Sequence, residues 1–146
     1  MIRSMDKLGR LRMFAASTTG IVEEFRRLHE SSPTATAAAG RTITAAAMMA
    51  ATMKNERDKL TLKISGGGPL GSIIVVGNNK GELKALVDNP GADAPSTPDK
   101  KLDVGRIVGN DGTVTVIMDL GLKDPYIGQT SLLTGEIAED IANFYM

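Results

Sequence analysis

The residues with the most chemically suggestive spacing are the run Gly66-Gly67-Gly68-Pro69-Leu70-Gly71. Glycine-rich loops bind phosphate when they follow a strand and open a helix, because the first amides of the helix then point at the anion. Here the loop leads instead into Ser72–Val76, which is β-branched and strand-like. We therefore predict a wide structural bend between two strands, with a small-ligand or phosphate site at this turn as the alternative. The residues that form the bend are Gly66, Gly67, Gly68, Pro69 and Gly71.

Other reactive side chains are scarce. The chain has no cysteine, which excludes disulfides, thiol catalysis and thiolate metal sites within it. Its one histidine, His29, cannot hold a metal alone or complete a serine triad. Glu136 and Asp140 are four residues apart and could meet on a helix, although a solvated face is the simpler interpretation. We therefore predict no catalytic residue, no metal and no cofactor in this chain.

Length and charge limit the number of domains and the kinds of partner that the chain can have. A chain of 146 residues fits one domain, and 42% apolar residues suffice for a core that must be largely aliphatic, since only 3% are aromatic. Basic and acidic residues balance at 17 each, which gives no reason to expect nucleic acid or an anionic membrane as a partner. The first 73 residues nevertheless carry 11 basic and six acidic side chains, and the rest the reverse. Two halves that face each other, a dimer, or a polarised binding face would each explain this asymmetry.

No targeting or membrane segment is predicted. Residues 1–16 are too polar for the apolar region of a signal peptide. The most apolar helix candidate, Pro33–Met53, is interrupted by Arg41, and the twelve residues between Arg41 and Lys54 fall short of the ~20 that a membrane span needs. We therefore expect a cytoplasmic protein.

Strand patterns dominate the middle of the chain. Lys59–Ser65 alternates polar and apolar residues, Ser72–Val76 is a continuous apolar run typical of a strand covered on both faces, and Glu82–Val87 alternates again. These three form a meander. Further strands are predicted at Ile2–Met5 with Arg10–Ala15, at Leu102–Val108 with Thr113–Asp119 around an Asp-Gly turn, and at Tyr126–Leu132.

Three helices are expected. One runs from Thr18 or Thr19 to His29, a second spans Pro33–Met53 after the N-cap Ser32, and a third begins near Thr134 or Gly135. The predicted fold class is therefore α+β, with mostly antiparallel sheets of about five to seven strands packed against two to three helices.

Two groups of apolar side chains are candidates for a binding surface. Methionines near the end of the second helix either fill gaps in the core or form an adaptable surface that accepts varied partners. The last helix carries a second apolar face and runs to the final residue without a cap, which suggests a fragment of a longer protein. The candidates are Met48, Met49, Met53, Ile137, Ile141, Phe144 and Tyr145.

Several short motifs occur together in a fixed order along the chain. They are Pro33–Arg41, Gly66–Gly71, Asn89-Pro90, Lys101–Arg106, Lys123–Tyr126 and Ser131–Asp140. In combination they resemble the N-terminal domain of the heat-shock protein 33 family, the redox-regulated bacterial chaperones. The resemblance covers nearly the whole chain, and its specificity lies in the combination.

The resemblance implies an ATP-independent, cytoplasmic holdase that binds unfolding or partly folded client proteins under oxidative and heat stress, with a homodimer expected. In this family a C-terminal domain holds zinc on four cysteines, and oxidation releases the zinc and exposes client-binding surface. Residues 1–146 would then be the chaperone N-terminal domain, truncated at its C-terminal end. The zinc-binding redox-switch domain is absent from them, and zinc is expected only in the full-length protein.

Overall fold

The computed structural model describes residues 1–146 and contains two antiparallel sheets and four helices, which confirms the predicted α+β class. The strands number seven, within the expected range, while the helices exceed the expected two to three. In chain order the elements are β1 (Ile2–Met5), β2 (Arg12–Ala15), α1 (Thr19–His29), α2 (Pro33–Ala50), β3 (Lys59–Ser65), β4 (Ser72–Gly77), β5 (Leu83–Val87), α3 (Val104–Val108), β6 (Thr113–Asp119), β7 (Tyr126–Ser131) and α4 (Ala138–Phe144).

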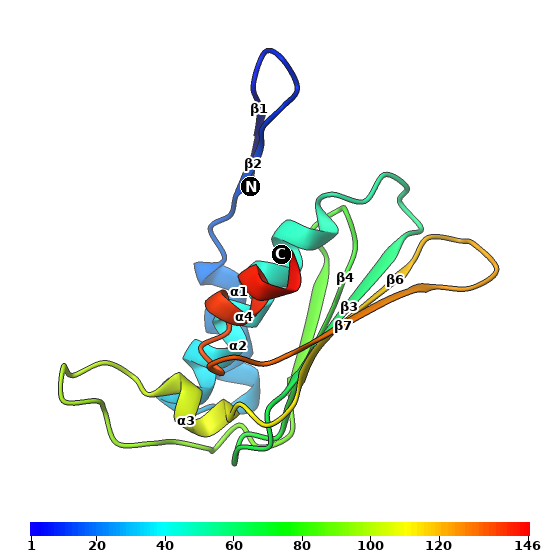
Figure 1. Ribbon diagram of the computed structural model, residues 1–146. Coiled ribbons are helices and arrows are strands. Elements are labelled where there is room, and N and C mark those ends of the chain that lie inside the picture. Colours follow the sequence, from blue (N-terminus) through cyan, green and yellow to red (C-terminus); the bar gives the residue numbers. More distant parts are fainter.

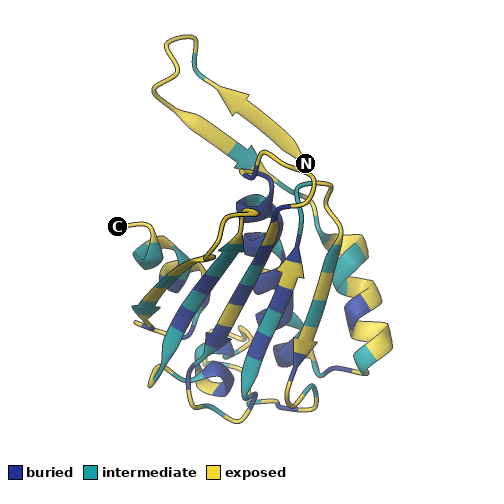
Figure 2. Ribbon diagram, turned by 90° about the vertical axis from the view of Figure 1, so that its right-hand side faces the viewer, coloured by how far each residue is buried: buried dark blue, intermediate teal, exposed yellow.

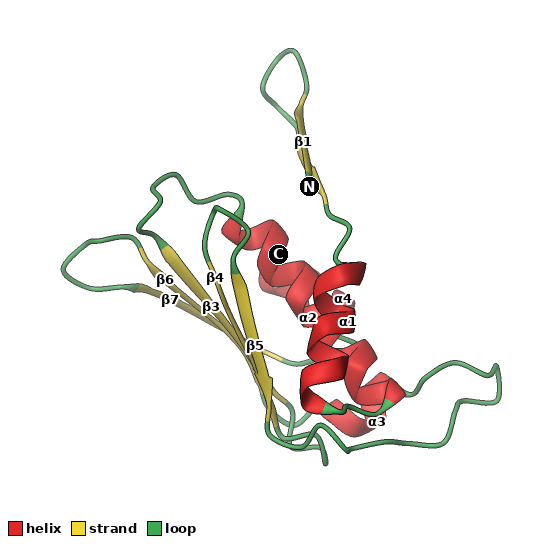
Figure 3. Ribbon diagram, turned by 180° about the vertical axis from the view of Figure 1, so that it is seen from behind, coloured by secondary structure: helices red, strands yellow, loops and turns green.

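The larger sheet has the strand order β5-β4-β3-β6-β7, so the predicted meander β3-β4-β5 is confirmed and β6-β7 extends it at the other edge of β3. Leu62 of β3 lies opposite Val75 of β4 and Val116 of β6, and all three are fully buried. Figures 1 and 3 show the helices on the same side of this sheet. The core therefore lies between one face of the sheet and the helical layer.

Helix α2 is the centre of the helical layer. The Ser32 side chain accepts a hydrogen bond from the Ala35 amide at 3.0 Å, and Pro33 occupies the first turn, as the sequence predicted. Ala39 and Ala46 are fully buried, and such small side chains let the helix lie close to the sheet. The helix ends at Ala50 rather than Met53, because the Thr52 and Met53 amides turn back to the carbonyls three residues earlier.

The smaller sheet is the hairpin β1-β2, which projects away from the body of the molecule (Figure 1). Its second strand begins at Arg12 rather than Arg10. Arg3 pairs with Phe14 and Met5 with Arg12, so these four side chains share one face of the hairpin.

The prediction of a strand at Leu102–Val108 is wrong, because Val104–Val108 forms the short helix α3. The Asp103 carboxylate accepts a hydrogen bond from the Arg106 amide at 3.2 Å and so caps this helix. Val104, Ile107 and Val108 are buried at a spacing of three and four, which is helical. Strand β6 pairs instead with β3 and β7.

The prediction that Ser72–Val76 is covered on both faces is also wrong. Ile73 and Val75 are fully buried beneath the helices, whereas Ile74 is half-buried and Val76 is 37% exposed. Figure 2 looks onto this second face of the sheet, across which no helix lies. We call it the open face, and its large apolar side chains are Ile74, Val76, Leu86, Ile117 and Ile127.

The last helix, α4, begins at Ala138 rather than near Thr134 or Gly135, because a turn occupies the residues before it. None of the four helices combines the length and the apolar character that crossing a lipid bilayer requires.

Candidate functional site

A long hollow lies on the side of α2 that faces away from the sheet, between α1 and α4. It has a volume of about 760 Å³. Small side chains of α2 form its floor, since Ala37, Gly40 and Thr44 recur at helical spacing along it. Thr18 is tied to Thr44 by a hydroxyl–hydroxyl hydrogen bond of 2.6 Å, which fixes the start of α1 against α2. The hollow is lined by Thr18, Thr19, Val22, Glu23, Pro33, Thr36, Ala37, Gly40, Arg41, Thr44, Ala45, Met48, Leu102, Ile137, Ala138 and Ile141.

A second hollow of about 350 Å³ continues the first toward the end of α2. The two share Ala45, Met48 and Ile141, so they form one surface, which we call the apolar groove. The second hollow is lined by Phe14, Ala45, Met48, Met49, Thr52, Ile141 and Tyr145.

The structure brings five of the seven predicted surface residues to this groove. Met48 and Ile141 are half-buried, and Tyr145 is 63% exposed, so these three offer apolar atoms to solvent. Met49 and Ile137 are only 3% and 1% exposed, so they form part of the floor of the groove. Partial burial raises the pKa of the Tyr145 hydroxyl, with a smaller contribution from Tyr126, so the phenol stays neutral.

The other two predicted residues lie elsewhere. The Phe144 ring packs over Gly128 of β7 and belongs to the edge of the core, although it also meets Tyr145 edge to face at 5.5 Å. Met53 is 7% exposed and belongs to the core beyond the end of α2. Phe144 therefore does not line the apolar groove, because α4 turns its ring toward the sheet.

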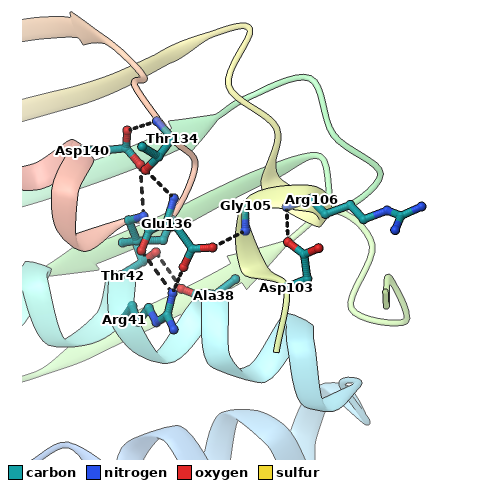
Figure 4. Close-up of polar contacts among 10 residues, drawn as sticks. Ala38, Arg41, Thr42, Asp103, Gly105, Arg106, Thr134, Glu136 and Asp140 are labelled. Atoms are coloured by element: carbon teal, nitrogen blue, oxygen red, sulfur yellow. Dashed lines mark hydrogen bonds and ion pairs between the residues drawn. The ribbon is translucent and has the colours of Figure 1, made fainter. Parts of the chain in front are cut away.

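A polar cluster holds one end of the groove in shape (Figure 4). The Arg41 guanidinium donates to a Glu136 carboxylate oxygen at 2.6 Å and to the Glu136 carbonyl at 3.2 Å. The other carboxylate oxygen accepts from the Gly105 amide at 3.1 Å. Glu136 therefore joins α2, α3 and the turn before α4.

Asp140 is fully buried and has a structural role. Its carboxylate accepts hydrogen bonds from the amides of Leu133, Thr134 and Ile137 at 2.7, 3.0 and 3.0 Å. This holds Ile137 at φ 70°, where the Ala138 amide donates to the Glu136 carbonyl at 2.8 Å in a γ-turn. A β-branched residue rarely adopts this conformation, so Asp140 stabilises a strained turn that places Ile137 in the groove.

The glycine-rich turn packs backbone against backbone on the segment from α3 to β6. The Gly68 amide donates to the Val108 carbonyl at 2.9 Å, and the Leu70 amide donates to the Ile107 carbonyl at 3.0 Å. A Cβ atom on Gly68 would lie 2.3 Å from the Ile107 oxygen. These amides are thus already engaged, which supports the structural bend over the alternative phosphate site.

The open face is a second apolar surface, which the sequence analysis missed. Leu86 is 54% and Ile127 is 62% exposed, while Lys63 and Lys84 supply charge on the same face. The signal for it is present in the sequence, because the buried face of the meander is fully occupied by the alternate residues Leu60, Leu62 and Ile64 and their partners.

Comparisons with known proteins show which family the chain belongs to. A sequence model of the family described as Hsp33 protein matches residues 1–146. The 33 kDa chaperonin of Alkaliphilus metalliredigens (strain QYMF) is 48% identical over 146 residues, which are 100% of this chain and 50% of that protein. The 33 kDa chaperonin of Clostridioides difficile (strain 630) is 48% identical over 145 residues, 99% of this chain and 50% of that protein.

A solved structure gives the same result for the fold. The crystal structure of the 33 kDa chaperonin (heat shock protein 33 homolog) of Thermotoga maritima superposes with a TM-score of 0.91 at 31% identity, covering 98% of this chain and 49% of that one. Fold and sequence thus define a class whose named members are chaperones. The chain belongs to the Hsp33 family, and it spans about half the length of the curated relatives it matches.

Proposed function

We propose that this chain is the client-binding half of an ATP-independent holdase, which captures unfolding or partly folded proteins and prevents their aggregation. The observation that carries the proposal is the apolar groove, because a holdase needs apolar surface that is accessible, adaptable and rimmed by polar groups. Methionine suits such a surface, since its unbranched, polarisable side chain adapts to many shapes.

The groove has the length of a short extended peptide. Its α2 floor runs from Thr36 to Met48, which is about 18 Å at the helical rise. An extended segment of about five residues covers that length. Its walls carry few charges, and the Arg41–Glu136 pair lies at the rim with side chains 42% and 39% exposed. Short apolar segments, which any unfolding protein exposes, would therefore fit.

We assign regulation to the half of the full-length relatives that this chain does not span. The chain has no cysteine, so a redox switch that holds zinc on four cysteines would lie in that other half. We further propose that the full-length protein is cytoplasmic and dimeric, a state that sedimentation at several concentrations would measure.

The test is light scattering of a heat-unfolding client protein with and without the 146-residue chain. Met48→Gln combined with Tyr145→Ser should weaken suppression of aggregation severalfold, because both side chains present apolar surface in the groove. Leu86→Lys combined with Ile127→Lys makes the same kind of change on the open face. Circular dichroism and thermal unfolding establish that every variant is folded.

The two variants give distinct results. Loss of suppression only with Met48 and Tyr145 changed would support the groove as the client site. Loss only with Leu86 and Ile127 changed would move client binding to the open face, and absence of suppression by the folded, unmodified chain would reject the proposal for this half. Repeating the assay with peroxide should not activate the chain, since no thiol is present, and oxidation of Met48 to its polar sulfoxide should weaken suppression.

A further inference from the structure

A third hollow, with a volume of about 700 Å³, lies where the projecting hairpin meets the end of α2. Arg3 and Arg12 enter it from the inward face of the hairpin, Lys54 from the segment after α2, and Lys80 from the turn between β4 and β5. We call it the basic hollow. Its lining residues are Arg3, Ser4, Met5, Arg12, Phe14, Ala51, Thr52, Met53, Lys54, Glu56, Asn79 and Lys80.

The charge of the basic hollow is largely unbalanced. One carboxylate lines it, that of Glu56, and it is paired with the Lys80 ammonium at 2.9 Å. Arg3, Arg12 and Lys54 form no ion pair. In a chain with no net charge, three uncompensated cations converge here from two separate parts of the fold. The hollow is therefore complementary to an anionic group.

The basic hollow is continuous with the apolar groove. Phe14 and Thr52 line both, so a chain that leaves the groove past Met48 and Tyr145 enters the hollow next. A single extended segment would thus meet apolar walls along α2 and then a cluster of cations.

We propose that this surface selects client segments in which acidic residues directly adjoin a short apolar stretch at one end. The inference rests on the proposed holdase function and names the class of segment that the same site prefers. About five apolar residues would lie along α2, and two or three carboxylates beyond them would face Arg3, Arg12 and Lys54.

One effect opposes this preference. The carboxyl end of α2 points at the basic hollow, and the dipole of a helix places roughly half a negative charge there. Some of the positive charge therefore serves the helix itself. Three unpaired cations exceed that partial charge, so an attractive potential for carboxylates remains.

The experiment measures fluorescence anisotropy with three labelled eight-residue peptides and the 146-residue chain. Each peptide has the same five apolar residues, followed by three glutamates, three glutamines or three lysines, and a second set places the polar residues first. The glutamate peptide should bind about three- to tenfold more tightly than the glutamine peptide at low salt, and the lysine peptide more weakly. In ~1 M salt the three affinities should converge, because the screening length falls to about 3 Å.

Substitutions of the cations test which residues cause the preference for the glutamate peptide. Arg3→Glu with Arg12→Glu should abolish or reverse the preference for glutamate while leaving binding of the glutamine peptide unchanged. Lys54→Glu reverses a charge of the same hollow outside the hairpin, and it should weaken the preference for glutamate even if the Arg3 and Arg12 changes alter the hairpin itself. Arg106→Glu with Lys123→Glu is the matched control, since both side chains are exposed and neither lines the basic hollow or the groove.

The outcomes separate this inference from the holdase proposal. Equal binding of all three peptides would overturn the inference and leave the proposed function standing, whereas failure of every peptide to bind would overturn both at this site. Tripolyphosphate serves as a competing anion. If it displaces an anionic dye from the hollow but does not displace the glutamate peptide, the hollow is an anion site unrelated to clients. If the Arg3 and Arg12 changes alter the sedimentation coefficient, a second copy of the chain occupies the surface, which also overturns the inference.

Discussion

Arg41 and Glu136 are 95 positions apart in the sequence, and an ion pair of 2.6 Å joins them. Because Arg41 lies in the middle of α2 and Glu136 just before α4, the pair ties together the two elements that form the floor and one wall of the apolar groove. Glu136 also reaches the Gly105 amide of α3. The two residues therefore do not contribute equally to the fold.

Removing the two partners should have unequal effects. Arg41→Ala should lower the free energy of unfolding by about 0.5–1 kcal/mol, as expected for a partly exposed ion pair. Glu136→Ala should cost roughly 1–2 kcal/mol, because it also leaves the Gly105 amide without its acceptor. Urea unfolding of both single variants and the double variant measures the difference. Equal costs would mean that the Gly105 hydrogen bond contributes nothing.

The glycine-rich turn gives a second prediction. Gly68→Ala should destabilise the fold by about 2–3 kcal/mol, because the new Cβ would lie 2.3 Å from the Ile107 carbonyl oxygen in a rigid backbone contact. Gly20→Ala is the matched control, since nothing lies within 4 Å of a Cβ on that helical residue. The control should be neutral or stabilising by up to ~1 kcal/mol. Thermal unfolding compares them, and a Gly68→Ala protein as stable as the parent would contradict this account of the turn.

Local patterns predicted most of the fold. Period-two alternation in Lys59–Ser65 placed β3, and Ser32-Pro33 placed the start of α2, because capping and alternation act within a few residues. Val104–Val108 was predicted as a strand because its short apolar run fits either period. It forms a helix because Asp103 caps its first turn and because the side chains of Val104–Val108 pack against α2.

The site could be predicted only in part. Helical spacing brought Met48, Ile141 and Tyr145 into the candidate set, but it could not show that Phe144 turns toward β7, since that depends on how α4 lies on the sheet. The basic hollow combines Arg3 with Lys80, which line one surface only because the folded chain places the base of the hairpin beyond the end of α2. Such long-range contacts leave no periodic signal in the sequence.

Asp140 should be the most sensitive carboxylate in the chain. Asp140→Ala removes a buried carboxylate that accepts from three amides, so we expect a loss of about 3 kcal/mol or more and release of the strained turn at Ile137. Glu139→Ala changes its exposed neighbour and should stay within ~0.5 kcal/mol of the parent. Amide hydrogen exchange at Leu133, Thr134 and Ile137 reports the turn directly. Unchanged protection in Asp140→Ala would show that packing alone maintains it.

Asp93 provides the prediction for pH dependence. Its carboxylate accepts hydrogen bonds from the Thr34 hydroxyl, near the start of α2, and from the Ala94 amide at 3.0 Å. The Thr34 hydrogen bond is the main cause that lowers the pKa of Asp93 below its ordinary value of about 3.8. Because the unfolded chain then binds the proton more readily, this contribution to stability is complete above that value. It is lost as the pH falls through the lower pKa of the folded state.

Thr34→Val tests this linkage, because it removes the hydroxyl while nearly conserving the shape of the side chain. The pKa of Asp93, followed by carboxyl chemical shifts, should rise toward its ordinary value, and unfolding should depend less on pH between about 5 and 2. Thr36→Val is the control, since the Thr36 hydroxyl bonds to Ser31 and the Ser32 carbonyl instead. A pKa of Asp93 that is unchanged in Thr34→Val would assign the shift to the backbone amides. The loop that carries Asp93 would then be fastened to α2 through main-chain contacts, such as that from the Ser32 amide to the Pro90 carbonyl at 2.9 Å.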